Sequence, residues 1–79
     1  MKVSVRAYGS IREIVGAERP GDIVEVDVAP GSTVASVAEY LGVSPGMVFL
    51  AILDGEPCDL AARVGEGAEV TLMPPFTGG

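Results

Sequence analysis

Hydrophobic and polar residues alternate in three separate stretches of the chain, at residues 2–8, 24–28 and 69–73. A period of two places every second side chain on the same side of an extended backbone, so each stretch is predicted to be a strand with one buried face. The first two strands are expected to pair as an antiparallel hairpin with a long connection.

A fourth strand is predicted at residues 48–53, although its pattern is different. The run is apolar throughout, which is typical of a strand that is buried on both sides or along its flank. The Asp54-Gly55 pair that follows predicts a tight turn into a short segment at 56–59. Residues 60–67 are expected to link this segment to the last strand.

The main helix is expected to begin near Val34, from which apolar residues recur at i, i+3, i+4 and i+7. Ser32 or Thr33 can cap its amino end, and Gly42 can end it. A shorter helical turn is expected at 10–15. Short strands packed on one main helix indicate a small α+β domain.

The composition is that of one small domain with its own core. The chain has 79 residues, of which 48% are hydrophobic and 20% are charged. No stretch reaches transmembrane length, and the alternating start is unlike a signal peptide. The single cysteine excludes an intrachain disulfide, and no metal site is expected in a chain without histidine. These features fit a cytoplasmic protein.

The net charge narrows the choice of partners. Five basic and eleven acidic residues give a charge of −6. This balance disfavours nucleic acids and anionic membranes, because both are bound through clusters of Lys and Arg. A basic protein surface is the better partner.

Three other kinds of chemistry have weaker support. Cys58 has no histidine to act as its base and no Lys or Arg close in sequence, so we expect a half-buried structural residue rather than a nucleophile. Glu25 and Asp27 alternate along a predicted strand and are expected to form a solvated face rather than a metal or acid/base site. The chain contains no glycine-rich phosphate-binding motif.

The last six residues, Pro-Pro-Phe-Thr-Gly-Gly, carry the clearest functional signal. Pro74 and Pro75 lack the backbone N–H that a sheet requires and favour an extended chain. Gly78 and Gly79 have no Cβ and can pass through a channel too narrow for other residues. We therefore predict a domain over 1–73 and a flexible arm over 74–79. The simpler alternative is a frayed chain end without function.

Four stretches carry a resemblance to a known family, namely 5–16, 30–34, 54–56 and 67–79. They resemble the MoaD/ThiS sulphur carriers, which are ubiquitin-like β-grasp proteins. The resemblance implies a mixed sheet of four to five strands packed on one main helix. The Arg12-Glu13 pair and the Pro-Pro-x-x-Gly-Gly ending are most similar to the small subunit of molybdopterin synthase.

The resemblance also implies a chemistry for the chain end. A terminal carboxylate has a pKa of about 3.5, so at neutral pH it is charged and must be activated before it can react. In this family, an adenylating enzyme related to the ubiquitin-activating enzyme E1 uses ATP and Mg²⁺ to form an acyl-adenylate on the last glycine. Sulphur then converts it to a thiocarboxylate. Gly79 would carry the sulphur, and Gly78 and Gly79 would let the arm enter the adenylating site. The chain itself would bind no cofactor.

Partner contacts are expected around the start of the arm. If Val3, Val5 and Ala7 face the helix, strand parity turns Tyr8 to the opposite, open face of the sheet, and the same parity turns Met73 outward. The first and last strands of a β-grasp sheet are parallel neighbours, so Tyr8 and Met73 should lie side by side. The resemblance adds further partner-binding positions at Arg12, Pro74, Pro75, Phe76 and Thr77.

Several functions remain open at this point. In the molybdopterin branch, a larger synthase subunit would accept the arm and pass the sulphur to a pterin precursor, so that the chain would be a co-substrate more than a catalyst. Other family branches supply sulphur for thiamine thiazole or for cysteine synthesis. A ubiquitin-like modifier attached to lysines and a binding domain with an inert tail are the further alternatives.

Overall fold

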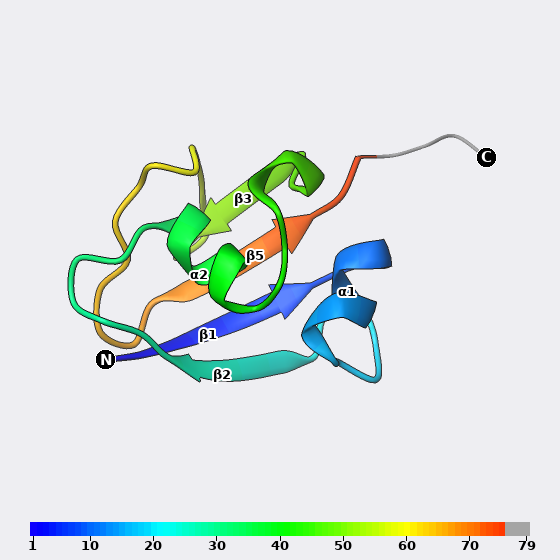
Figure 1. The fold of residues 1–79 in the computed structure, drawn as a ribbon, viewed down its shortest axis with the longest axis horizontal. Coiled ribbons are helices and arrows are strands. Elements are labelled where there is room, and N and C mark those ends of the chain that lie inside the picture. The colour runs from blue at the N-terminus through cyan, green and yellow to red at the C-terminus, as the bar shows by residue number, and fades with distance from the viewer. Residues whose placement is uncertain (76–79) are drawn as a thin grey trace.

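The computed structural model describes residues 1–75, which form an α+β domain with one five-stranded sheet. The sheet order is β2-β1-β5-β3-β4, with β1 and β5 parallel and the other neighbouring pairs antiparallel. Helix α2 covers one face of this sheet (Figure 1). The predicted sheet on one main helix is therefore confirmed. Along the chain the elements are β1 (Lys2–Ala7), α1 (Gly9–Val15), β2 (Ile23–Asp27), α2 (Val34–Tyr40), the 3-10 turn η1 (Pro45–Met47), β3 (Leu50–Leu53), β4 (Glu56–Cys58) and β5 (Glu69–Met73).

The core lies between the sheet and α2. The alternating residues Val3, Val5 and Ala7 of β1 are buried, as predicted, and so are Val70 and Leu72 of β5. The parallel register pairs Val5 with Val70 and Ala7 with Leu72, so the buried residues of the two strands form one continuous apolar surface. Full burial of each Val or Leu side chain contributes about 1.5–3 kcal/mol. Val34, Val37 and Ala38 of α2 cover this surface.

Helix α2 depends on a distant segment for its amino end. The Thr33 hydroxyl accepts a hydrogen bond from the amide of Ser36 (3.1 Å), which confirms Thr33 as the cap. The two amides before Ser36 donate outside the helix, from Val34 to the carbonyl of Ala62 and from Ala35 to the carbonyl of Leu60, both at 2.9 Å. The first amides of a helix have no partner within it, so the segment that follows β4 completes α2.

Both α-helices are short, with seven residues each. Helix α1 ends at Gly16, whose φ of 82° is the left-handed conformation that glycine adopts most easily. The backbone N–H of Gly16 donates to the carbonyls of Arg12 and Glu13 and so closes the last turn of α1. No helix in the described part of the chain is long and apolar enough to cross a membrane.

The apolar run at residues 48–53 is only partly the buried strand that was predicted. Strand β3 occupies Leu50–Leu53, and within it only Ala51 is fully buried. Phe49 lies before the strand and is 76% exposed. Leu50, Ile52 and Leu53 are only half-buried, less than predicted, because β3 lies near the edge of the sheet, next to the short strand β4. The Asp54-Gly55 turn is confirmed, with positive φ at both residues.

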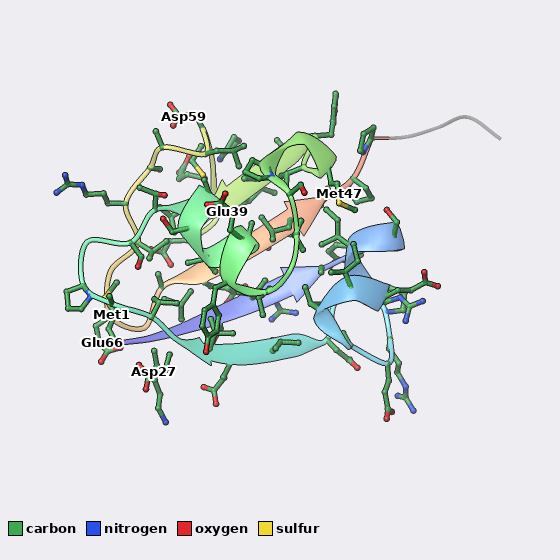
Figure 2. The ribbon with its side chains drawn as sticks, viewed as in Figure 1. Met1, Asp27, Glu39, Met47, Asp59 and Glu66 are labelled. Carbon is green, nitrogen blue, oxygen red and sulfur yellow. The ribbon has the colours of Figure 1, made fainter. Side chains whose placement is uncertain are left out.

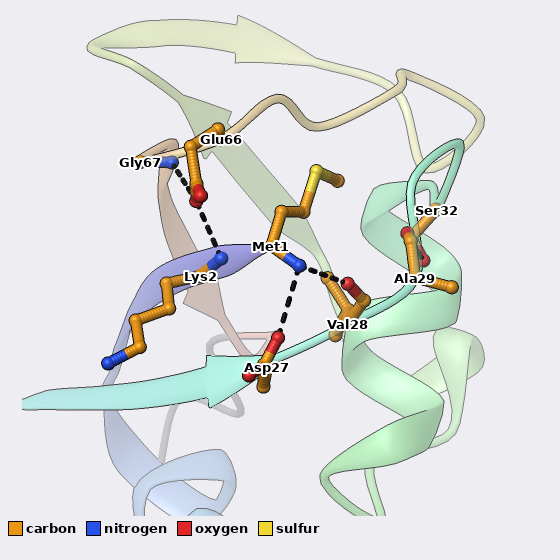
Figure 3. Close-up of polar contacts among 8 residues, drawn as sticks. All are labelled: Met1, Lys2, Asp27, Val28, Ala29, Ser32, Glu66 and Gly67. Carbon is orange, nitrogen blue, oxygen red and sulfur yellow. Dashed lines mark hydrogen bonds and ion pairs between the residues drawn. The ribbon is translucent and has the colours of Figure 1, made fainter.

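Polar contacts hold the amino end of β1 in place (Figure 3). The Met1 ammonium group donates to the Asp27 carboxylate (3.1 Å) and to the carbonyl of Val28 (2.8 Å). Glu66 accepts from the amides of Lys2 (2.6 Å) and Gly67 (3.1 Å). Because β1 and β5 are parallel, these contacts all lie at the opposite end of the sheet from residue 73. Figure 2 shows Asp27 and Glu66 at this end and Met47 toward the other.

Two isoleucines of α1 test the extent of the core. Ile11 is fully buried and Ile14 is 40% exposed. We expect Ile11→Ala to lower the free energy of unfolding by about 2–5 kcal/mol, because it leaves a cavity between α1 and the sheet. Ile14→Ala, the matched control on the same helix, should cost much less. Urea denaturation of both variants measures the difference, and equal losses would contradict the described position of α1.

Candidate functional site at the start of the arm

An apolar groove lies where β1 and β5 end side by side. The two strands are parallel and pair as far as Ala7 and Leu72, so the residues that follow each strand emerge at the same edge of the sheet. In Figure 1, α1 lies beside this edge. The groove has a volume of about 660 Å³. We call it the arm-root groove, and it is lined by Tyr8, Gly9, Ser10, Phe49, Leu50, Met73, Pro74 and Pro75.

The structure brings Tyr8 and Met73 together in this groove, as strand parity predicts. Both side chains are half-buried. The Tyr8 ring lies against Gly21, where an added Cβ would come within 3.0 Å of the phenol oxygen. The loop that carries Gly21 is tied to β1, because the Gly21 amide donates to the carbonyl of Ala7 (3.2 Å). The loop at Gly21 therefore packs against one part of the Tyr8 ring, and another part of the ring lines the groove.

Phe49 is a groove residue that sequence reasoning missed. Its amide donates to the carbonyl of Met73 (2.8 Å), which holds it beside the end of β5, while its side chain is 76% exposed. A largely exposed aromatic side chain on the border of an apolar groove is typical of a protein-binding surface. The pairing of Leu50 with Met73 places Phe49 here, and this register joins strands far apart in sequence.

Arg12 belongs to α1 and does not line the groove. Its Nη1 donates to the carbonyl of Ala17 (3.0 Å) and to the carbonyl of Glu18 (3.1 Å). Its Nη2 lies 4.0 Å from the Glu13 carboxylate, and one quarter of its side chain is exposed. Arg12 therefore stabilises the loop after α1. Its role in partner binding stays a prediction.

Cys58 lies on β4, outside the groove, and is half-buried as predicted. Burial raises the pKa of its thiol, and the negative charge of Asp59 raises it further. The thiolate is the nucleophilic form, so both effects make Cys58 less reactive at neutral pH. This environment suits a structural residue.

Only the first two residues of the predicted arm belong to the described part of the chain. Pro74 is half-buried against the groove, and Pro75 is exposed. The predictions for Phe76, Thr77, Gly78 and Gly79 lie outside the described residues.

Three solved structures share this fold. SAMP1 from Haloferax volcanii has a TM-score of 0.72 at 22% sequence identity, with 100% of both chains covered. Molybdopterin converting factor subunit 1 from Pyrococcus furiosus has a TM-score of 0.70 at 18% identity, covering 96% of this chain and 99% of that one. A complex of subunits 1 and 2 of the molybdopterin-converting factor from Helicobacter pylori has a TM-score of 0.60 at 21% identity, with full coverage of both chains. The fold is therefore that of a ubiquitin-like β-grasp protein.

The sequence itself identifies the family. It matches the ThiS family over residues 5–79, and the chain belongs to this family of ubiquitin-like sulphur carriers. The predicted resemblance to MoaD/ThiS proteins is thus confirmed. No match was found among curated protein sequences.

The role of Arg12 in the loop can be measured directly. We expect Arg12→Ala to lower the free energy of unfolding by about 1–2 kcal/mol, because two carbonyls lose a charged donor. Arg19→Ala is the matched control, since the exposed Arg19 side chain makes no hydrogen bond within residues 1–75. Thermal or urea denaturation compares the two. If Arg12→Ala changes partner binding and leaves stability intact, the guanidinium serves a partner rather than the loop.

Proposed function

We propose that this protein is a sulphur carrier for molybdopterin biosynthesis and that the carboxylate of Gly79 is its reactive group. The observation that carries the proposal is the family match, which continues through β5 to residue 79 and so includes the diglycine. The apolar groove at the end of β5 supports it, because a partner that handles the arm must bind next to this point.

The proposed reaction has two steps. An E1-like enzyme transfers the adenylyl group of Mg²⁺-ATP to the Gly79 carboxylate, which releases pyrophosphate and gives an acyl-adenylate. A hydrosulphide ion released by a sulphur donor then attacks the carbonyl carbon, the bond to AMP breaks, and a thiocarboxylate and a proton are formed. Activation is needed because the carboxylate is an anion at neutral pH and a poor electrophile. The carrier supplies the acyl group, and the partner supplies the catalytic residues.

The molybdopterin branch is favoured by two of the solved neighbours. One is described as molybdopterin converting factor subunit 1, and another is a complex of subunits 1 and 2 of that factor. We propose that a large synthase subunit binds the arm-root groove of this chain and receives Gly79 in its own site. Tyr8, Met73 and Phe49 would anchor that contact.

The second candidate function is protein modification. The likeness to SAMP1, small archaeal modifier protein 1, favours it, because the two chains match over their whole length. Activation of Gly79 would be shared, and only the product differs. A carrier yields a thiocarboxylate, whereas a modifier yields an amide bond between Gly79 and a lysine of another protein.

Mass spectrometry of the intact protein tests the reactive group. After incubation with the cognate activating enzyme, ATP, Mg²⁺ and a sulphur donor, one oxygen of Gly79 should be replaced by sulphur. Deletion of Gly79 should abolish the change without lowering the melting temperature, because the core of the described domain is built from residues up to Leu72. An unchanged mass of the wild-type protein would refute the carrier function. Amide-linked conjugates without any thiocarboxylate would favour the modifier.

Binding measurements test the groove. Phe49→Ala should weaken binding to the large subunit at least tenfold, or about 1.4 kcal/mol, because the side chain is exposed and borders the groove. Tyr8→Ala and Met73→Ala should act in the same direction. Tyr40→Ala is the control, since Tyr40 is an exposed aromatic residue of α2 that does not line the groove. Equal effects of Phe49→Ala and Tyr40→Ala in calorimetric titrations would show that the partner binds elsewhere.

A further inference from the structure

The described part of the arm touches the domain at one unusually close contact. Gly9 follows β1 and Pro74 follows β5, and they continue the parallel register of Ala7 and Leu72. A Cβ placed on Gly9 would lie 2.7 Å from Cγ of Pro74, which is 0.7 Å short of the 3.4 Å at which ordinary contact begins. The proline ring therefore rests directly on the backbone of Gly9.

Neither partner of this contact can adjust easily. Cγ of Pro74 belongs to a ring that closes on its own backbone nitrogen, so the ring cannot move aside as the end of a flexible side chain would. Gly9 has a φ of +56°, a backbone conformation that residues other than glycine seldom adopt. A methyl group on Gly9 must consequently displace the backbone of the arm.

We propose that Gly9 is a positioning residue that sets the direction in which the arm leaves the sheet. This inference rests on the proposed function, because direction matters only if Gly79 must reach a partner's active site. Gly9 does not touch the reacting atoms and acts through Pro74. A misplacement of about 1 Å at a reacting group can lower a rate by a factor on the order of 100. The contact acts on the start of the arm, at Pro74, which precedes Gly79 by five residues in the sequence.

The chain offers controls that separate this contact from backbone strain. Gly16 and Gly31 have φ values of +82° and +88°, and a Cβ on either would meet no atom within 4 Å. Alanine at these positions therefore also incurs backbone strain from a positive φ, but its Cβ does not touch the arm. Gly16→Ala also lies at the end of α1, the helix that Gly9 begins.

The experiment compares adenylation of Gly79 in full-length variants. Gly9→Ala should lower kcat of the activating enzyme for this carrier at least tenfold while KM changes little, because the carrier still binds but presents its end poorly. Gly16→Ala and Gly31→Ala should keep wild-type kcat. In a Pro74→Ala background, which lacks the ring, Gly9→Ala should have little further effect. Equal kcat for the three glycine variants, or an undiminished Gly9 effect beside Pro74→Ala, would overturn the inference.

A readout that is independent of the reaction completes the test. In NMR spectra of the free protein, Gly9→Ala should shift the resonances of Met73 and Pro74, whereas Gly31→Ala should leave them in place. Unshifted resonances would overturn the proposed contact even if Gly79 is activated. If the wild-type protein is never adenylated but the Met73 and Pro74 resonances shift, the proposed function fails and the contact itself stands.

Discussion

The parallel pairing of β1 with β5 is the interaction on which the rest of the structure depends. It joins two strands from opposite ends of the described chain, and the remaining strands extend the sheet outward from this pair. Val5 and Val70, paired and fully buried, lie in the floor of the core that α2 covers. The same pairing decides where the arm begins, because parallel strands deliver Tyr8 and Met73 to one edge. Fold and candidate site thus share a single cause.

The two ends of this central pair have opposite character. At the start of β1, charged groups hold the backbone, with the Met1 ammonium group on Asp27 and the Glu66 carboxylate on two amides. At the finish of β5, the surface is an apolar groove with a largely exposed aromatic residue, Phe49. The domain therefore differs along its strands: one end of the sheet is held by ionic contacts, and the other end exposes hydrophobic surface. The end of the sheet at which β5 stops therefore carries the exposed hydrophobic surface that is typical of a protein-binding site.

The sequence predicts those parts of the fold in which one face of an element is buried. The alternation at residues 2–8 leads correctly to β1, and the cap at Thr33 leads correctly to α2. At residues 48–53 the pattern predicts the strand correctly but overestimates its burial, since a strand near the sheet edge with half-buried residues on both faces has no periodic pattern. Tyr8 and Met73 were predictable because parity is a local property once the parallel pairing is assumed. Phe49 was not, because its place depends on a β3–β5 register that local pattern does not determine.

The amino end of α2 has a consequence for how the domain folds. A seven-residue helix is unstable in isolation, since a nucleus of one turn costs more entropy than its few hydrogen bonds recover. The amides of Val34 and Ala35 find their acceptors only when the backbone at Leu60 and Ala62 has returned to the helix. Helix α2 therefore cannot fray at this end without releasing the returning segment as well. The helix, its returning segment and the sheet beneath them should open and close as one cooperative unit, and amide exchange at Val34 and Ala35 would follow the unfolding of the whole domain.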